Sequence, residues 1–404
     1  MYRQTRASLT YLLILITTLV TGCWNRREID TLGLVMASGI DEAEDGGIKL
    51  TVHVAKPFAI GGGESDTKGS LEKPFWVVTS TGKTVFEAVR NLASQSPRRL
   101  YWAHNRFLII GEALARKGVT EILDLFARDA EPRLLAFIVV AKGATAWDLL
   151  QAEFELEKMP SEGGQGIIPN VEQSLSSIVE AKLTDFLLRL ESEGIEPVGI
   201  QADIIPLQPD YAVDGDLQRK EVKSRVRFGG TAVFKGGKLV GWLDERETRG
   251  ANWVLGKVSS GILVVKQPGQ EDKLVSLEIL RGRGNVKAEI KDSKVSIKIR
   301  VEAEANLGEA QGTFDPVQSP QTWAVLETYM KEAIQGEISA ALEKIRELNS
   351  DILGFGAAVF RKDPKYWREI EGRWYEVFPD LEITVEVNAK LRRTGLIMRS
   401  AREK

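Results

Sequence analysis

The feature that constrains this chain most is an apolar run near its N-terminus that ends at the only cysteine. Two arginines precede residues 9–20, and Cys23 follows the small residues Thr21 and Gly22. A charged start, about a dozen apolar residues and small residues before a cleavage point are typical of a secretory signal peptide. A permanent transmembrane helix needs about 20 apolar residues, so this run is too short to be one.

The residues around the cleavage point resemble a bacterial lipobox, with Val20 as its branched residue and Cys23 as the residue that receives the lipid. A thiolate is nucleophilic enough to be alkylated by diacylglycerol. The alternative is a plain secretory signal in which Cys23 is incidental, but an exported chain seldom carries one free thiol. We therefore predict that residues 1–22 are a cleaved signal peptide and that Cys23 is lipidated.

Size and charge limit the remaining possibilities. The chain has 404 residues, which suggests two or three domains because a single core rarely grows past about 250–300 residues. The formal net charge of -3 becomes -5 when Arg3 and Arg6 leave with the signal peptide, which does not favour nucleic acid as a partner. With Cys23 committed to lipid no disulfide can form, so stability must come from packing.

The first half alternates strand and helix patterns, which predicts an α/β or α+β domain over residues 23–195. Apolar residues at helical spacing predict helices near 85–92, with Thr81 or Thr84 as N-cap, and near 119–126. Alternating or continuous apolar runs predict strands at 48–54, 75–79, 106–111 and 134–141, the last one fully buried.

The middle of the chain is predicted to contain the domain boundary. Residues 145–156 have a helical pattern, the Gly- and Pro-rich residues 159–169 predict a break, and residues 175–190 are helical again. Pro197, Pro206 and Pro209 then mark a segment, 196–225, that is either a connection or part of a third, middle domain.

The second half, residues 226–400, predicts an antiparallel sheet with one long helix laid against it. The helix is expected over residues 320–349, where apolar residues recur every three or four positions. Strands are predicted at 225–234, 238–243, 261–266, 275–281, 286–290, 295–303 and 381–391. The fold class is therefore α+β and multi-domain, with a mixed sheet and packed helices in the N-terminal half.

No pattern in the sequence indicates catalysis, a metal or a cofactor. His53 and His104 lie in different predicted elements, so we expect structural histidines rather than a metal site. No Gly-x-Ser-x-Gly elbow is present, and Cys23 is already assigned to the lipid. Paired carboxylates such as Asp244 and Glu245 are expected on solvated faces. The Trp367 to Tyr375 cluster could form a carbohydrate or partner surface, but its spacing favours helix packing.

Several blocks of the chain, taken in order, carry a family resemblance. The first is residues 23–29, Cys-Trp-Asn-Arg-Arg-Glu-Ile, directly after the lipobox. The others are residues 97–105 with Gly111-Glu112, residues 230–234 with 241–243, residues 247–250, residues 351–356, Trp374 with Phe378-Pro379, and residues 392–395. Together these blocks resemble the Ger(x)C family, the lipoprotein C subunits of spore germinant receptors in endospore-forming bacteria; Asn25 stands where the family often has Asp.

The resemblance implies a non-enzymatic subunit on the outer face of the spore inner membrane, anchored by lipid. It would assemble with multi-pass A and B subunits in a complex that responds to nutrient germinants. A solute-binding lipoprotein of a transporter and a lipid-anchored cell-wall hydrolase are the alternatives. Candidate partner-surface residues are Trp24, Arg26, Arg27, Tyr101, Trp102, His104 and Asn105. For the last four, and for Arg249, Gly250 and residues 351–356, a purely structural role is equally compatible.

Overall fold

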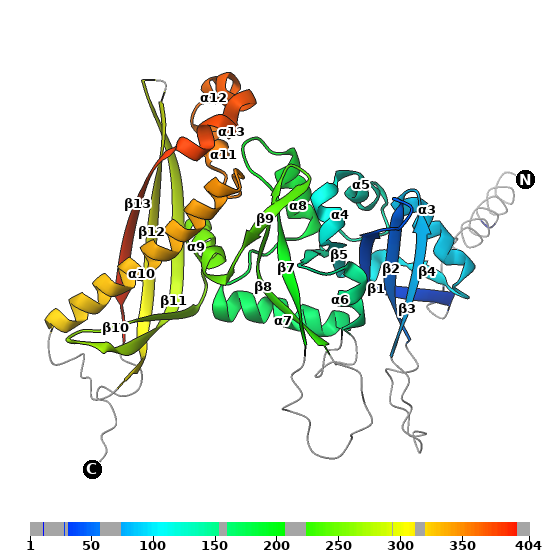
Figure 1. Ribbon diagram of the computed structural model, residues 1–404, viewed down its shortest axis with the longest axis horizontal. Coiled ribbons are helices and arrows are strands. Elements are labelled where there is room, and N and C mark those ends of the chain that lie inside the picture. Colours follow the sequence, from blue (N-terminus) through cyan, green and yellow to red (C-terminus); the bar gives the residue numbers. More distant parts are fainter. Residues whose placement is uncertain are drawn as a thin grey trace, which may run out of the picture.

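The structure is a computed structural model. It describes residues 31–56, 74–152, 160–206, 224–292, 294–311 and 320–393, together with the single residues Tyr11 and Glu28. The predicted lipobox, Trp24, Arg26, Arg27 and residues 394–395 lie outside this set. Two β-sheets with packed helices lie at opposite ends of the longest axis (Figure 1), so the predicted α+β class is confirmed.

The first sheet has nine strands in the order β3-β2-β1-β5-β6-β7-β8-β9, with β4 beside β1. Neighbours from β1 through β5 and β6 to β7 pair in parallel, and the outer strands pair antiparallel, so the sheet is mixed as predicted. Its strands are β1 (Leu32–Glu42), β2 (Ile48–Ala55), β3 (Phe75–Gly82), β4 (Arg99–Tyr101), β5 (Phe107–Gly111), β6 (Phe137–Ala141), β7 (Val198–Pro206), β8 (Ser224–Lys235) and β9 (Lys238–Leu243).

Helices cover both faces of this sheet, which explains why its central strands are apolar without alternation. In β5, Leu108 and Ile110 belong to one core cluster with α3, α4, α5 and α8, while Phe107 and Ile109 belong to another with α6 and α7. The helices are α3 (Val85–Asn91), α4 (Glu112–Lys117), α5 (Thr120–Arg128), α6 (Ala146–Gln151), α7 (Pro160–Leu175) and α8 (Leu183–Glu191), with short 3-10 turns η2 (Leu92–Ser94) and η3 (Trp102–His104). Thr84 caps α3, as one of the two predicted alternatives.

Three predictions for this half are wrong. The strand predicted at 134–141 begins only at Phe137, and Leu134 and Leu135 are exposed. Residues 159–169, predicted to be a break, start helix α7, whose Gly164 lets the helix lie directly on the Phe107 ring. The helix predicted over 175–190 is interrupted after Leu175, and α8 begins at Leu183.

The first sheet also runs through the boundary predicted at residues 195–225. Strand β7 pairs with β6 and β8 pairs with β7, so the described parts of the predicted connection are sheet strands rather than a linker. The chain passes to the second sheet through α9 (Glu245–Leu255), a helix that the sequence did not lead us to expect. The domain limits themselves stay a prediction.

The second sheet has the order β10-β11-β12-β13, with β10 (Gly261–Gln267), β11 (Gln270–Lys291), β12 (Lys294–Ala310) and β13 (Glu382–Leu391). Strands 275–281 and 286–290, predicted as two, are parts of β11. The sheet is not wholly antiparallel as predicted, because β13 runs parallel to β12. Parallel neighbours require a long crossover, supplied here by α10 (Pro320–Glu347), α11 (Phe355–Lys362), α12 (Pro364–Ile370), η5 (Glu371–Arg373), α13 (Trp374–Val377) and η6 (Phe378–Asp380).

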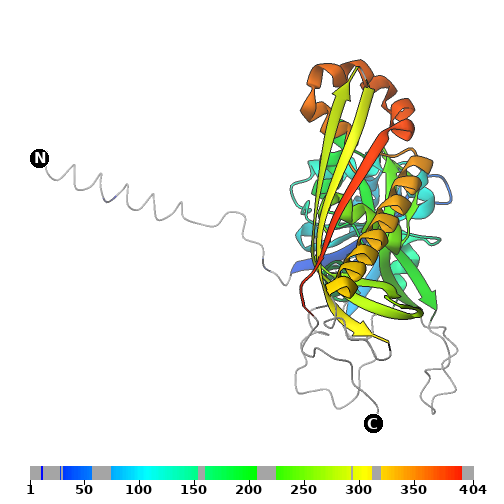
Figure 2. The ribbon, with the colours of Figure 1, turned by 90° about the vertical axis from the view of Figure 1, so that its left-hand side faces the viewer.

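Helix α10 is the predicted long helix, and Figure 2 shows it lying along the second sheet beside β13. The alternating residues of β12 that face it, among them Ile297, Ile299 and Val301, are buried. Trp367, Trp374 and Phe378 are buried as well, so the prediction that this aromatic cluster packs in a core is confirmed.

Helix α9 joins the two halves through contacts that its small and polar residues allow. The Arg249 guanidinium forms an ion pair with the Glu337 carboxylate of α10, with Nε donating at 3.0 Å to Oε2, and Trp253 Nε1 donates to the same oxygen at 2.9 Å. Gly250 sits against the α10 backbone, since a Cβ there would lie 2.0 Å from the Glu337 carbonyl oxygen. Asn252 Nδ2 donates to the carbonyl of Ser176 at 2.8 Å in the loop before α8.

We predict that Gly250→Ala lowers the free energy of unfolding by about 1–3 kcal/mol, the usual cost of overpacking, because the new methyl group would force α9 and α10 apart. Urea denaturation followed by tryptophan fluorescence measures this. Gly336→Ala is the matched control, because its Cβ would meet only the end of the Arg246 side chain, at 3.3 Å. A helical Gly→Ala change there should be neutral or slightly stabilising. Equal losses in both variants would contradict the prediction.

Candidate functional site

The four described candidates for a partner surface separate into an exposed pair and a buried pair. Tyr101 is half-buried, His104 is exposed, and their rings lie 5.8 Å apart. Trp102 is buried edge-on against Phe126, with ring centroids 6.5 Å apart. Asn105 is also buried, and its Nδ2 donates to Ser38 Oγ at 2.9 Å. Trp102 and Asn105 therefore serve the core, and only Tyr101 and His104 are accessible to a partner.

The exposed pair lies beside the start of the fold. Strand β4 runs parallel to the first residues of β1, with Leu32 opposite Arg99 and Leu34 opposite Tyr101. Leu32 follows Cys23 by nine residues, and nine extended residues span at most about 30 Å. Tyr101 and His104 therefore lie beside the start of β1, the first strand after the predicted lipid site.

The block at residues 351–356 forms a polar junction at the start of α11. The Asp351 carboxylate accepts hydrogen bonds from Phe355 N at 3.0 Å and Gly356 N at 2.7 Å, and from Trp374 Nε1 at 3.3 Å. Gly354, at φ 73°, turns the chain into the helix in the left-handed region. Complete burial outweighs these hydrogen bonds and raises the pKa of Asp351 from 3.8 to about 6.

The other side of this junction is formed by the last turn of α8 and the segment that follows it. Arg189 Nη1 donates to the carbonyls of Glu196 at 3.1 Å and Ile352 at 3.0 Å, and burial lowers the pKa of its guanidinium. The Tyr375 hydroxyl donates to the Glu196 carboxylate, and burial together with that carboxylate raises the pKa of Tyr375. The junction therefore connects the first sheet to helices α11–α13, which gives residues 351–356 a structural role.

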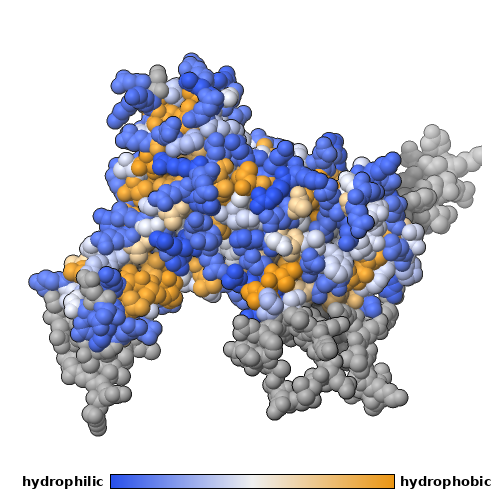
Figure 3. Space-filling view, in the orientation of Figure 1, coloured by the Kyte–Doolittle hydropathy of each residue, from blue (hydrophilic) through white to orange (hydrophobic). Residues whose placement is uncertain are grey.

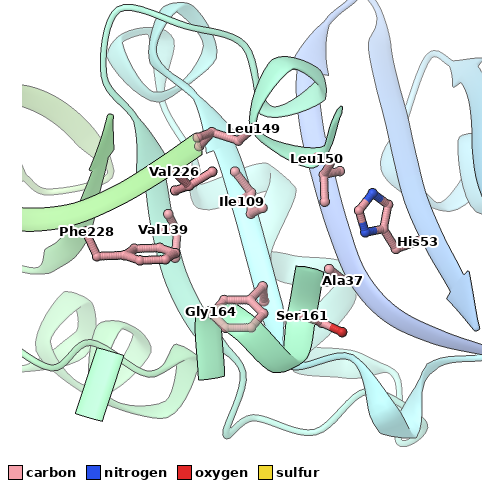
Figure 4. Close-up of a pocket in the computed structure, with 11 residues that line it drawn as sticks. Ala37, His53, Ile109, Val139, Leu149, Leu150, Ser161, Gly164, Val226 and Phe228 are labelled. Atoms are coloured by element: carbon pink, nitrogen blue, oxygen red, sulfur yellow. The ribbon is translucent and has the colours of Figure 1, made fainter. Parts of the chain in front are cut away.

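A small cavity lies on the first sheet, under α6 and α7 (Figure 4). Its walls are mostly apolar, and the His53 ring and the Ser161 hydroxyl supply the polar atoms. Ser161 Oγ is buried without a hydrogen-bond partner in the structure. The cavity volume is about 30 Å³, which is room for one or two water molecules rather than a metabolite. Nothing in the sequence pattern had indicated this cavity.

The two histidines lie apart in the structure as well. His53 is buried in β2 with its ring stacked on Phe75 at 4.8 Å, and His104 is exposed in η3. Across the described residues, no group of three or more His, Cys, Asp or Glu side chains is placed to hold a metal ion.

We predict that the stabilising contribution of Asp351 decreases as pH rises. Its pKa is higher in the folded chain than in the unfolded one, so this contribution is complete below about pH 4 and is lost as pH rises through about 6. A pKa raised from 3.8 to about 6 corresponds to about 3 kcal/mol. Asp351→Asn cannot titrate, so the stability of wild type relative to this variant should fall by up to that amount between pH 4 and pH 7.5 in chemical denaturation. A pH-independent difference would contradict it.

Comparisons with known proteins place the chain in one family. The family described as "Spore germination protein N-terminal domain" matches residues 25–200, and "Spore germination B3/ GerAC like, C-terminal" matches residues 229–395. Residues 201–228 lie between the two matched ranges.

Relatives align over nearly the whole chain. Spore germination protein KC of Bacillus subtilis (strain 168) is 28% identical over 400 residues, which are 96% of each chain. Spore germination protein B3 of the same organism is 25% identical, with 93% of this chain and 95% of the relative aligned. Spore germination protein GerQC of Bacillus cereus is 21% identical, with coverage of 95% and 98%.

The crystal structure of the GerBC protein shares the fold. It superposes with a TM-score of 0.53 at 21% identity and covers 88% of this chain and 98% of its own. Because both halves match family descriptions in chain order, the chain belongs to the Ger(x)C family of spore germination proteins, as its sequence blocks predicted.

Proposed function

We propose that this chain is the lipid-anchored, non-enzymatic C subunit of a nutrient germinant receptor. It is held at the outer face of the spore inner membrane through Cys23 and assembles with multi-pass A and B subunits. The observation that carries the proposal is the lipobox: the only cysteine of the chain stands nine residues before β1 of a fold that belongs to a spore germination family. Among the described helices, none is long and apolar enough to cross a membrane.

The position of Tyr101 and His104 supports assembly close to the bilayer. Both residues are accessible. Tyr101 ends strand β4, which is paired with the first residues of β1, and His104 ends the turn η3 that follows β4. A short tether keeps this part of the fold within reach of membrane-embedded subunits. Trp24, Arg26 and Arg27 precede β1 in the sequence and belong to the same proposed contact region.

The alternative, a solute-binding lipoprotein, requires two similar α/β lobes around a ligand cleft. The second sheet has only four strands and its α10 crossover, and it does not repeat the mixed, two-sided arrangement of the first. No specific observation therefore favours the alternative. Calorimetry of the protein with amino acids and sugars tests it, since micromolar binding would support a solute-binding role.

We predict that Cys23→Ala moves the protein from the membrane fraction to the soluble fraction and impairs germination, because the acyl chains are the proposed anchor. Each buried methylene of an acyl chain contributes about 0.8 kcal/mol. Fractionation of spores with immunoblotting, followed by a germination assay, measures both effects. Asn25→Ala leaves the thiol in place and is the control. Normal germination with a soluble Cys23→Ala protein would refute the lipid-anchored function.

We predict that Tyr101→Ala combined with His104→Ala weakens co-purification with the A and B subunits about tenfold, the scale of an interface hot spot. The fold should stay intact because neither side chain is buried. Phe360→Ala, at an exposed aromatic residue of α11, is the control and should leave assembly unchanged. Trp102→Ala should instead lower stability by about 3–5 kcal/mol, seen as a lower melting temperature. Full assembly in the double variant would exclude this surface.

A further inference from the structure

The two faces of the second sheet carry different side chains. Ile297, Ile299 and Val301 of β12 are buried on the face that α10 covers. Glu302 and Glu304 point to the opposite face, which we call the outer face, because successive side chains of a strand alternate. Figure 3 views the sheet from the α10 side and shows a hydrophobic patch below this helix. The outer face, by contrast, is charged.

Cations of the neighbouring strands flank the two carboxylates on the outer face. Residues in register on adjacent strands share a face of the sheet. Two rows therefore cross β11, β12 and β13, namely Arg281–Glu304–Lys390 and Arg283–Glu302–Asn388. Arg392 follows Lys390 by two positions and lies on the same face. The middle strand thus supplies the carboxylates, and its two neighbours supply the cations.

The two rows and Arg392 surround a hollow of about 180 Å³. This volume is below the roughly 300–1,000 Å³ of pockets that bind metabolites or cofactors, so the outer-face hollow has room for one small group. Its lining contains four cations and two carboxylates, which are Arg281, Arg283, Lys390 and Arg392 against Glu302 and Glu304. The excess of positive charge favours an anion as the ligand.

One of the two carboxylates is neutralised within the hollow. Glu304 Oε1 accepts from Arg392 Nη2 at 2.7 Å and also from Arg281 Nη2. These hydrogen bonds lower the pKa of Glu304 from 4.5 to about 2, so the group stays ionised. A guanidinium has five N–H donors. Both arginines are therefore held in place by Glu304 and keep donors for a second acceptor.

Arg283 is the cation with the most unused capacity. It is exposed, and within the described part of the chain it forms no ion pair, although Glu302 stands opposite in register. Lys390 is paired with Glu327 of α10 at 3.2 Å. Even with Glu327 counted, four cations face three carboxylates, so the positive excess remains.

We propose that the outer-face hollow binds a small oxyanion through a phosphate or carboxylate group, with Arg283 as the main donor. A guanidinium presents its N–H groups in a planar fork that matches both of these groups. Arg281 and Arg392 supply further donors from the two flanking strands. Glu302 opposes the anion and limits its affinity. The proposal does not depend on the lipid anchor, and it gives the second sheet a ligand of its own.

Calorimetric titration of the purified full chain with inorganic phosphate and with malonate tests the proposal, against sodium chloride at equal ionic strength. We expect a Kd of about 1 mM for one probe or both, the affinity that two charge-assisted hydrogen bonds of typical strength supply. Added salt should weaken the binding. The probe that binds more tightly identifies the preferred group. The absence of binding by both probes would overturn the proposal.

Two substitutions should change the affinity in opposite directions. Arg283→Gln should weaken binding about tenfold, because it removes the unpaired guanidinium. Glu302→Gln should strengthen binding severalfold, because it removes the opposing charge. Both side chains are exposed, so the fold should stay intact.

Arg300→Gln is the matched control for the change in net charge. Arg300 is exposed on the outer face of β12 and pairs with Glu386 at 2.9 Å, but it does not line the hollow. Its substitution should leave the affinity unchanged. An equal loss in Arg283→Gln and Arg300→Gln would mean that overall charge attracts the anion, and would overturn the assignment of the site.

Discussion

The relative position of the two sheets depends on the contacts that the buried Glu337 carboxylate of α10 makes with α9. It is almost completely buried, and Arg249 and Trp253 of α9 satisfy it. Removing one partner of a buried pair costs about 3–5 kcal/mol because the other charge stays desolvated. The pair can form only because Gly250 lets the α9 backbone touch α10. Helix α9 also binds the first half of the chain, because Thr248 Oγ1 donates to Thr231 Oγ1 of β8 and Asn252 Nδ2 donates to the Ser176 carbonyl in the loop before α8.

A second connection is also made by buried carboxylates. It lies between the end of α8 and the start of α11. Asp351 and Glu196 are buried carboxylates that receive backbone and aromatic N–H or O–H donors. Two separate polar connections fix the first sheet to the second half of the chain at two places.

Much of the fold could be predicted from local patterns. Strict alternation located β2 and β12, helical spacing located α10, and the spacing of Trp367, Trp374 and Phe378 indicated core packing. The structure divides the candidate surface into two pairs of residues. Tyr101, Trp102, His104 and Asn105 form one continuous block, yet a 3-10 turn directs Trp102 and Asn105 inward and leaves Tyr101 and His104 accessible. A single sequence does not separate these two pairs, because all four side chains can serve either purpose.

The sequence by itself predicted an export signal and determined the lone cysteine, the α+β class and the absence of any recognisable catalytic motif, since these depend on residue type and short-range spacing. Tertiary structure decided the rest. It turned a glycine-rich stretch into α7 by packing Gly164 on Phe107, made β13 parallel through a long crossover, and left Leu134 and Leu135 outside β6. The physical reason is that contacts between residues far apart in the chain, such as Gly164 on Phe107 and β13 beside β12, are not encoded in local spacing.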